Sequence, residues 1–125
     1  MKKKIAGCLI LVVFLLFLLI TYSFPTSLIK NDDFFMIVSM HYQGSDVTDQ
    51  VDLEDLIQIL EKYQKKRTLK QIPNTQPEIE INLVNEQQPL HIIIGKEALC
   101  YKDSGGKVWG ILEGEQFKKE LLLLL

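Results

Sequence analysis

The stretch EIEINLVNEQQPLHIII, residues 78–94, decides the fold class of this chain. From Ile79 to Leu83 apolar side chains alternate with polar ones, which is the pattern of a strand with one face toward water. Residues 85–89 are polar and predict a turn, and residues 90–94 predict a second strand. Because the link is short, we expect the two strands to pair as an antiparallel hairpin.

A helical pattern precedes this hairpin. Between residues 53 and 63 the apolar side chains recur at intervals of three and four, which places them on one face of a helix. They are Leu53, Leu56, Ile57, Leu60 and Tyr63. Asp49 or Asp52 can cap the start of this helix, and the prolines of the loop at residues 73–77 prevent its continuation.

The remaining elements follow from shorter patterns. We expect strands at residues 34–42, 98–101 and 107–112, a turn at residues 103–106 and a terminal helix at residues 113–125. The sequence therefore predicts an α+β domain. In it, one amphipathic helix and a C-terminal helix pack on an antiparallel sheet of three to five strands.

The N-terminal segment has a different composition. Lys2, Lys3 and Lys4 precede an uncharged run that extends from Ile5 to Ile29. As a helix, residues 5–24 would be about 30 Å long, the hydrocarbon thickness of a bilayer. The basic start predicts a transmembrane helix with a cytoplasmic N-terminus, and we expect a division into an anchor, residues 1–29, and an extracytoplasmic domain, residues 30–125.

A cleaved signal peptide is the alternative fate of this segment. Its cleavage site would be Thr21-Tyr22-Ser23, although the apolar run is long for a signal and has no Ala-x-Ala pattern. The domain would then be secreted. We prefer the uncleaved anchor, which makes the membrane the first partner of the chain through residues 5–24.

The charge balance excludes one class of partner. The first 29 residues hold three of the 14 basic side chains and none of the 16 acidic ones. The other 96 residues therefore carry 11 basic and 16 acidic groups, a formal net charge of −5. Because nucleic-acid binding requires a basic face that neutralises phosphates, we expect no nucleic-acid partner.

One basic cluster outside the N-terminus is a candidate interaction site. It consists of Lys62, Lys65, Lys66, Arg67 and Lys70. We interpret it mainly as the solvated C-terminal end of the amphipathic helix, where cations complement the helix dipole. The alternative is contact with anionic wall polymer or lipid headgroups. Trp109 is a second candidate, although we interpret it mainly as a residue that packs in the core or at an edge.

No chemical site is predicted. His41 and His91 each lie alone in a strand pattern, without the spacing of a metal site, and nothing places a base beside Cys100. A disulfide within the domain is excluded because Cys8 lies in the apolar segment. Cys100 is then a buried apolar residue, an intermolecular disulfide partner or a nucleophile, in decreasing order of preference. We expect no catalytic, cofactor-binding or metal-binding residue.

The chain resembles a family of small exported or membrane-anchored domains of unknown function from low-GC Gram-positive bacteria. The resemblance covers about residues 34–120, and 13 Lys against one Arg is the usage of AT-rich genes. The segments that carry it are Leu53–Tyr63, Lys66-Arg67-Thr68, Ile72-Pro73, Ile79–Leu83, Leu90–Ile94 and Gly110-Ile111. It implies a fold and a location, and offers no catalytic residues.

Two functions are compatible with these features. The first is a non-enzymatic, membrane-anchored extracytoplasmic module that binds a protein or envelope partner through a sheet face or a strand edge. The second is a small immunity or inhibitor protein that acts at the cell surface. An enzyme is not expected, because no nucleophile, base and orienting group can be named together.

Overall fold

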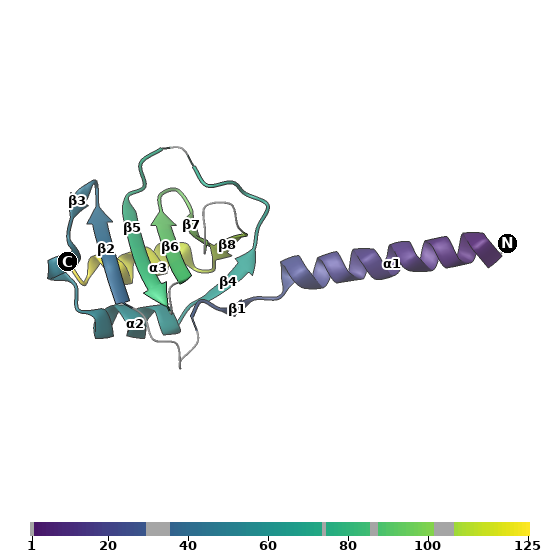
Figure 1. Cartoon of the computed structure of the whole chain (residues 1–125), viewed down its shortest axis with the longest axis horizontal. Coiled ribbons are helices and arrows are strands. Elements are labelled where there is room, and N and C mark those ends of the chain that lie inside the picture. Colours follow the sequence, from purple (N-terminus) through teal and green to yellow (C-terminus); the bar gives the residue numbers. More distant parts are fainter. Residues whose placement is uncertain (1, 30–35, 74, 86–87, 102–106) are drawn as a thin grey trace.

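The computed structural model describes residues 2–29, 36–73, 75–85, 88–101 and 107–125. This part of the chain forms an N-terminal apolar helix, one antiparallel sheet and two further α-helices (Figure 1). The elements are α1 (Lys2–Ser23), β1 (Thr26–Ser27), β2 (Met36–Tyr42), β3 (Ser45–Asp46), a 3-10 turn η1 (Thr48–Gln50), α2 (Leu53–Glu61), β4 (Gln64–Arg67), β5 (Ile79–Asn85), β6 (Gln88–Ile94), β7 (Ala98–Tyr101), β8 (Val108–Ile111) and α3 (Gly114–Leu122). The predicted α+β class is confirmed.

The sheet has the order β1-β4-β8-β7-β6-β5-β2-β3. β5 and β6 pair in the register Leu83↔Leu90 and Ile79↔Ile94, which confirms the predicted hairpin. β7 and β8 extend it as a meander. The predicted turn at residues 103–106 lies outside the described residues.

The predicted number of strands is wrong, because the described part of the chain contributes eight strands rather than three to five. β1 and β3 have only two residues each, too few for a recognisable alternation. β4 occupies a segment that the sequence assigned to the end of a helix. These three strands lie toward the two edges of the sheet, outside the central hairpin and meander.

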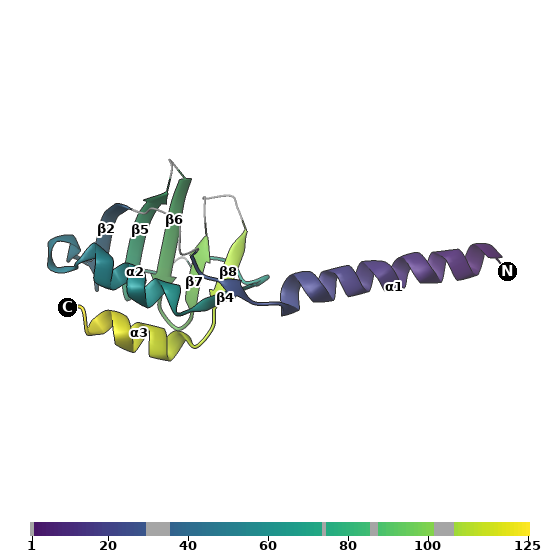
Figure 2. The same cartoon turned by 90° about the horizontal axis from the view of Figure 1, so that it is seen from below.

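Helices α2 and α3 cover one face of the sheet, so the domain has two layers (Figure 2). Alternation along the strands places one cross-strand row of side chains on this covered face: Met40, Ile81, Ile92, Cys100, Trp109 and Arg67. The first four are completely buried. The last two members, Trp109 of β8 and Arg67 of β4, carry polar groups. They lie near the edge of the sheet from which α1 departs.

Helix α2 begins where the sequence predicts a cap. The side chain of Asp52 accepts a hydrogen bond of 2.9 Å from the backbone N–H of Glu54, and this satisfies a donor that the first helical turn leaves open. Leu56 and Leu60, from the predicted apolar face, are completely buried. The helix ends at Glu61, so Tyr63 reaches the core from the segment that follows.

Helix α3 packs beside α2 through aromatic residues. The rings of Tyr63 and Phe117 lie edge to face, with centroids 4.8 Å apart and planes at 84°. Phe117 and Leu121 are completely buried. One such pair adds to the stability that apolar burial provides.

Helix α1 projects away from the sheet at the β1–β4 edge (Figures 1 and 2). It is long and apolar enough to cross a membrane, and none of its apolar window is buried, although a signal sequence would have the same properties. The chain after α1 joins the domain at once. β1 pairs with β4, and Leu28 and Ile29 are buried in the core, so residues 26–29 pack with the sheet.

Candidate functional site

The structure brings together three of the predicted site residues. Arg67 of β4 pairs with Trp109 of β8, and Lys65 lies two residues earlier on the same face. The Nζ atom of Lys65 is 4.9 Å from the Trp109 ring centroid, and the Cζ atom of Arg67 is 5.3 Å from it. Both distances allow cation–π attraction. We call Lys65, Arg67 and Trp109 the Trp109 cluster.

The other predicted residues lie apart from this cluster. The Nζ atom of Lys62 is 3.5 Å from a carboxylate oxygen of Glu120, and Lys70 forms an ion pair with Glu97. Lys66 pairs with Gly110, and strand alternation directs it to the opposite face of the sheet from Lys65. The six residues therefore do not form one continuous site.

The interpretation of this basic segment as a helix end is wrong for residues 64–67, although Lys62 is the C-cap of α2. The last turn of α2 contains no basic residue, and residues 64–67 form a strand instead. The physical reason is tertiary pairing. The carbonyl of Tyr63 accepts a hydrogen bond from Leu28, and that of Gln64 accepts one from Leu112, each 2.9 Å long. Pairing to chain segments on both sides satisfies more backbone groups than one further helical turn would.

A second group of side chains crosses the face of the sheet that lies opposite α2 and α3. Ser39, Asn82, His91 and Tyr101 are consecutive cross-strand neighbours in β2, β5, β6 and β7. The amide of Asn82 donates a 3.0 Å hydrogen bond to Ser39 Oγ, and Asn82 Oδ1 contacts His91 Nδ1. The rings of His91 and Tyr101 stack with centroids 4.9 Å apart. We call these four residues the polar row.

The bonding pattern fixes the chemistry of His91. Because Asn82 uses its amide group toward Ser39, its Oδ1 atom is the acceptor and His91 Nδ1 carries the donated proton. In the neutral ring, Nε2 is then an acceptor. The row thus places the imidazole of His91 and the phenol of Tyr101 side by side on the sheet.

A pocket of about 510 Å³ adjoins the polar row. Tyr101 and Glu80 line it from the sheet, together with Ile93 and the loop residues Ile72 and Pro73. Partial burial, and then the charge of Glu80, raise the pKa of Tyr101 above its ordinary value. Tyr101 therefore keeps its proton and can donate a hydrogen bond to a bound group.

His41 lies on the same face as the polar row. It pairs with Glu80 in the register, and its Nδ1 atom is buried with no hydrogen-bond partner among the described residues. In the sequence, each of the two histidines lies alone in its strand pattern. The register of the three strands places them on one face of the sheet, two residue positions apart along the strand direction.

Cys100 lies on the other side of the sheet from His91. His91 pairs with Tyr101, whereas Cys100 pairs with Ile92 and is completely buried. The predicted burial of Cys100 is confirmed. A Cys100–His91 nucleophilic pair cannot form across the sheet, because alternate residues of a strand point in opposite directions.

No group of three or more metal-binding side chains occurs among the described residues. No family model, no curated protein and no solved structure matches the chain. The Trp109 cluster and the polar row are therefore the features that bear on function, and the resemblance to exported domains stays a prediction.

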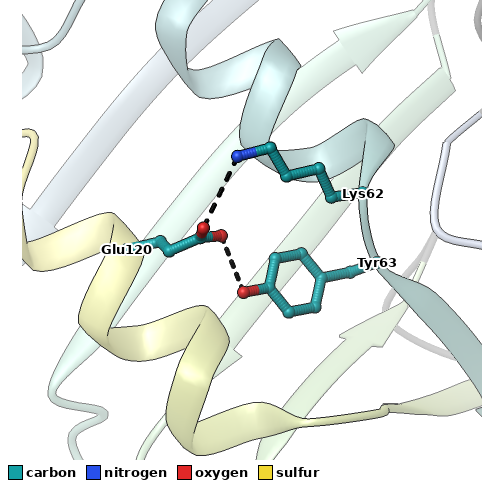
Figure 3. Close-up of polar contacts among 3 residues, drawn as sticks. All are labelled: Lys62, Tyr63 and Glu120. Atoms are coloured by element: carbon teal, nitrogen blue, oxygen red, sulfur yellow. Dashed lines mark hydrogen bonds and ion pairs between the residues drawn. The ribbon is translucent and has the colours of Figure 1, made fainter.

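The connection between α2 and β4, which contains Lys62 and Tyr63, contacts Glu120 of α3 (Figure 3). The hydroxyl of Tyr63 donates a 2.7 Å hydrogen bond to Glu120 Oε2, and Lys62 lies 3.5 Å from Oε1. The hydrogen bond from Tyr63, and then the charge of Lys62, hold the pKa of Glu120 below its ordinary value. Burial, and then the bond to Glu120, raise the pKa of Tyr63.

This contact predicts acid sensitivity. A carboxyl group whose pKa is lower in the folded state stabilises that state above the ordinary glutamate pKa of 4.5, and this stabilisation disappears as the pH falls through the folded pKa. We expect urea midpoints of the Tyr63→Phe and Glu120→Gln variants to fall less than that of the native chain between pH ~6 and ~3. Glu115→Gln, an exposed acid of the same helix, is the control and should keep the native slope.

Proposed function

We propose that the chain is a membrane-anchored binding module whose domain contacts a protein partner at the cell envelope. The observation that carries the proposal is the face of the sheet opposite α2 and α3. It presents the polar row and the adjoining pocket as one surface. Ordered polar and aromatic groups of this kind provide hydrogen bonds and contact area with little loss of side-chain freedom on binding.

The anchor is the second part of the proposal. Helix α1 has the length and composition of a membrane span. Lys2, Lys3 and Lys4 at its start support a cytoplasmic N-terminus and an extracytoplasmic domain. Fractionation of cells tests this part, because a shortened chain found only in the culture medium would show a cleaved signal and contradict the anchor.

Binding accounts for the polar row better than catalysis does. Asn82 is engaged by Ser39 and His91, and His91 stacks on Tyr101, so these groups hold one another in place. The single cysteine of the domain is on the covered face. What the row offers a ligand is a fixed set of hydrogen-bonding atoms beside an aromatic ring.

Site-specific photocrosslinking in intact host cells tests the binding surface. We expect a photoreactive phenylalanine analogue at position 101 of the full chain to give one discrete adduct. The same analogue at position 116, on an exposed part of α3, serves as the matched control. Asn82→Ala should reduce the adduct at position 101 several-fold, because it removes the residue that orients His91.

Two outcomes would contradict the proposal. Equal crosslinking at positions 101 and 116 would mean that the sheet face is not selective. A discrete adduct that is unaffected by Asn82→Ala in a folded variant would mean that the polar row does not form the contact surface. Folding of the variant is checked by the emission of Trp109, the only tryptophan of the chain.

A further inference from the structure

The edge of the sheet next to α1 has an unusual register. β1 pairs with β4 through Thr26↔Lys65 and Ser27↔Gln64, and the two strands are antiparallel. β4 therefore runs back toward the end of α1. Continuing the register by two residues sets Arg67 level with Phe24, the first residue after α1.

This register keeps Lys65 and Arg67 close to the membrane that α1 would cross. Thr26 is three residues beyond Ser23, a path of at most about 10 Å in extended chain. Lys65 is bonded beside it, and Arg67 is nearer still by the register. The headgroup layer of one leaflet is about 5–7 Å thick, so both side chains are within reach of it.

The charged residues of the domain are distributed unevenly along the same direction. β1 and β4 are at one end of the sheet order and β3 is at the other. The acidic residues at the far edge lie in β3, in η1, and at the N-cap and first turn of α2. They are Asp46, Asp49, Asp52, Glu54 and Asp55. Lys65, Lys66 and Arg67 lie at the edge next to α1, on both faces of the sheet. The exposed acids Glu61 and Glu113 line a hollow with Ser27 and Gln64 at this edge as well, so the three cations outnumber two acids here. We call this edge, which lies next to α1 (Figure 1), the basic edge.

We propose that this basic edge docks on anionic phospholipid headgroups of the leaflet from which α1 emerges. The inference rests on the proposed membrane anchor. The guanidinium of Arg67 and the ammonium of Lys65 are complementary to the lipid phosphates. Trp109, held against both cations, supplies an amphipathic ring of the kind found at membrane interfaces, and Phe24, 64% exposed, supplies an apolar one.

Trp109 is itself the probe for the test. The full chain is reconstituted into vesicles of phosphatidylcholine alone or mixed with phosphatidylglycerol, each with and without a lipid that carries a spin label on its headgroup. Spin labels quench tryptophan only at close approach. We expect stronger quenching of Trp109 in the vesicles that contain phosphatidylglycerol. The difference should disappear in ~1 M salt, where charges are screened over about 3 Å.

The double variant Lys65→Gln/Arg67→Gln should lose this dependence on anionic lipid. One basic side chain near an anionic leaflet favours the bound state about fivefold, so two contribute a change of about 25-fold in the ratio of docked to undocked domain. Quenching is expressed relative to the same variant without spin label, because removing the cations also alters the emission of Trp109. The control Lys96→Gln/Lys119→Gln removes two exposed cations elsewhere and should behave as the native chain.

The results separate this inference from the anchor on which it rests. Flotation of the vesicles in a density gradient shows whether the chain is bound to them. A chain that floats with neither kind of vesicle would contradict the anchor and the docking together. A chain that floats with both kinds, but whose Trp109 is quenched equally in them, would overturn the docking alone. Equal behaviour of the Lys65→Gln/Arg67→Gln variant and the native chain would also overturn it.

Discussion

We expect the replacement of Phe117 with alanine to lower the free energy of unfolding of the domain by about 3–5 kcal/mol. The ring is completely buried, and it makes the edge-to-face contact with Tyr63 that joins α3 to the chain after α2. A cavity at this position has walls from both helices and the sheet, so it cannot close without moving an entire helix. Domains of this size are stable by only about 5–15 kcal/mol, so the loss is a large fraction of the total.

Urea unfolding in non-ionic detergent, followed by the emission of Trp109, measures this loss. The helix α1 contains no tryptophan, so the signal reports the domain alone. Leu123→Ala is the control, because Leu123 follows the same helix and is 85% exposed, and it should change stability by about 0.5 kcal/mol or less. A loss below about 1 kcal/mol for Phe117→Ala would show that α3 does not form part of the core.

Replacing Leu28 with alanine should cost about 2–5 kcal/mol, which is a large effect for a residue that the sequence assigns to the anchor. Leu28 is 2% exposed and donates its backbone N–H to the carbonyl of Tyr63 at 2.9 Å. Its side chain belongs to the same core cluster as Leu60 and Phe117. The cost in unfolding free energy arises because removing this buried side chain would leave a cavity in the core, under the edge of the sheet.

The matched control is Phe24→Ala, four residues earlier on the same connection. Phe24 is 64% exposed, so its removal should leave the unfolding free energy of the domain in detergent nearly unchanged. If Leu28→Ala and Phe24→Ala had equal effects on the urea midpoint, residues 26–29 would be a linker and not a part of the fold.

The central part of the fold follows from local sequence. The alternation from Ile79 to Leu83 and the apolar run that ends at Ile94 predict a hairpin, and a slip of one residue would turn the apolar side chains of Ile79 to Leu83 away from the core. Helix α2 likewise follows from the spacing of Leu56 and Leu60 and from the cap at Asp52. Each of these signals is contained within a few consecutive residues.

The edges of the sheet could not be predicted in this way. Lys65 and Arg67 have no strand-like alternation of apolar residues, and they form β4 because β1 and β8 approach from distant parts of the sequence. Backbone pairing between such segments decides the conformation regardless of local propensity. The same pairing brings Trp109 to the cations, a contact between residues about 40 positions apart.

The polar row is an intermediate case. Asn82 and His91 are opposite each other in the register Leu83↔Leu90, and each lies in a strand that local sequence predicts. Adding Ser39 and Tyr101 requires the order of β2 and β7 around the hairpin, which no local pattern provides. A search for polar side chains opposite each other on a predicted hairpin would have found half of the row.

The shortness of β1 has a mechanical consequence. Two residues, Phe24 and Pro25, join it to α1, so any force on the anchor acts directly on a strand of two residues. Tension on α1 would therefore act first on the backbone hydrogen bonds that pair β1 with β4. The opening also requires Leu28 and Ile29 to leave the core, so the burial of these two side chains determines the force that is needed. Released residues 24–29 would form a tether that reaches at most about 20 Å, and the meander and its helices would stay folded.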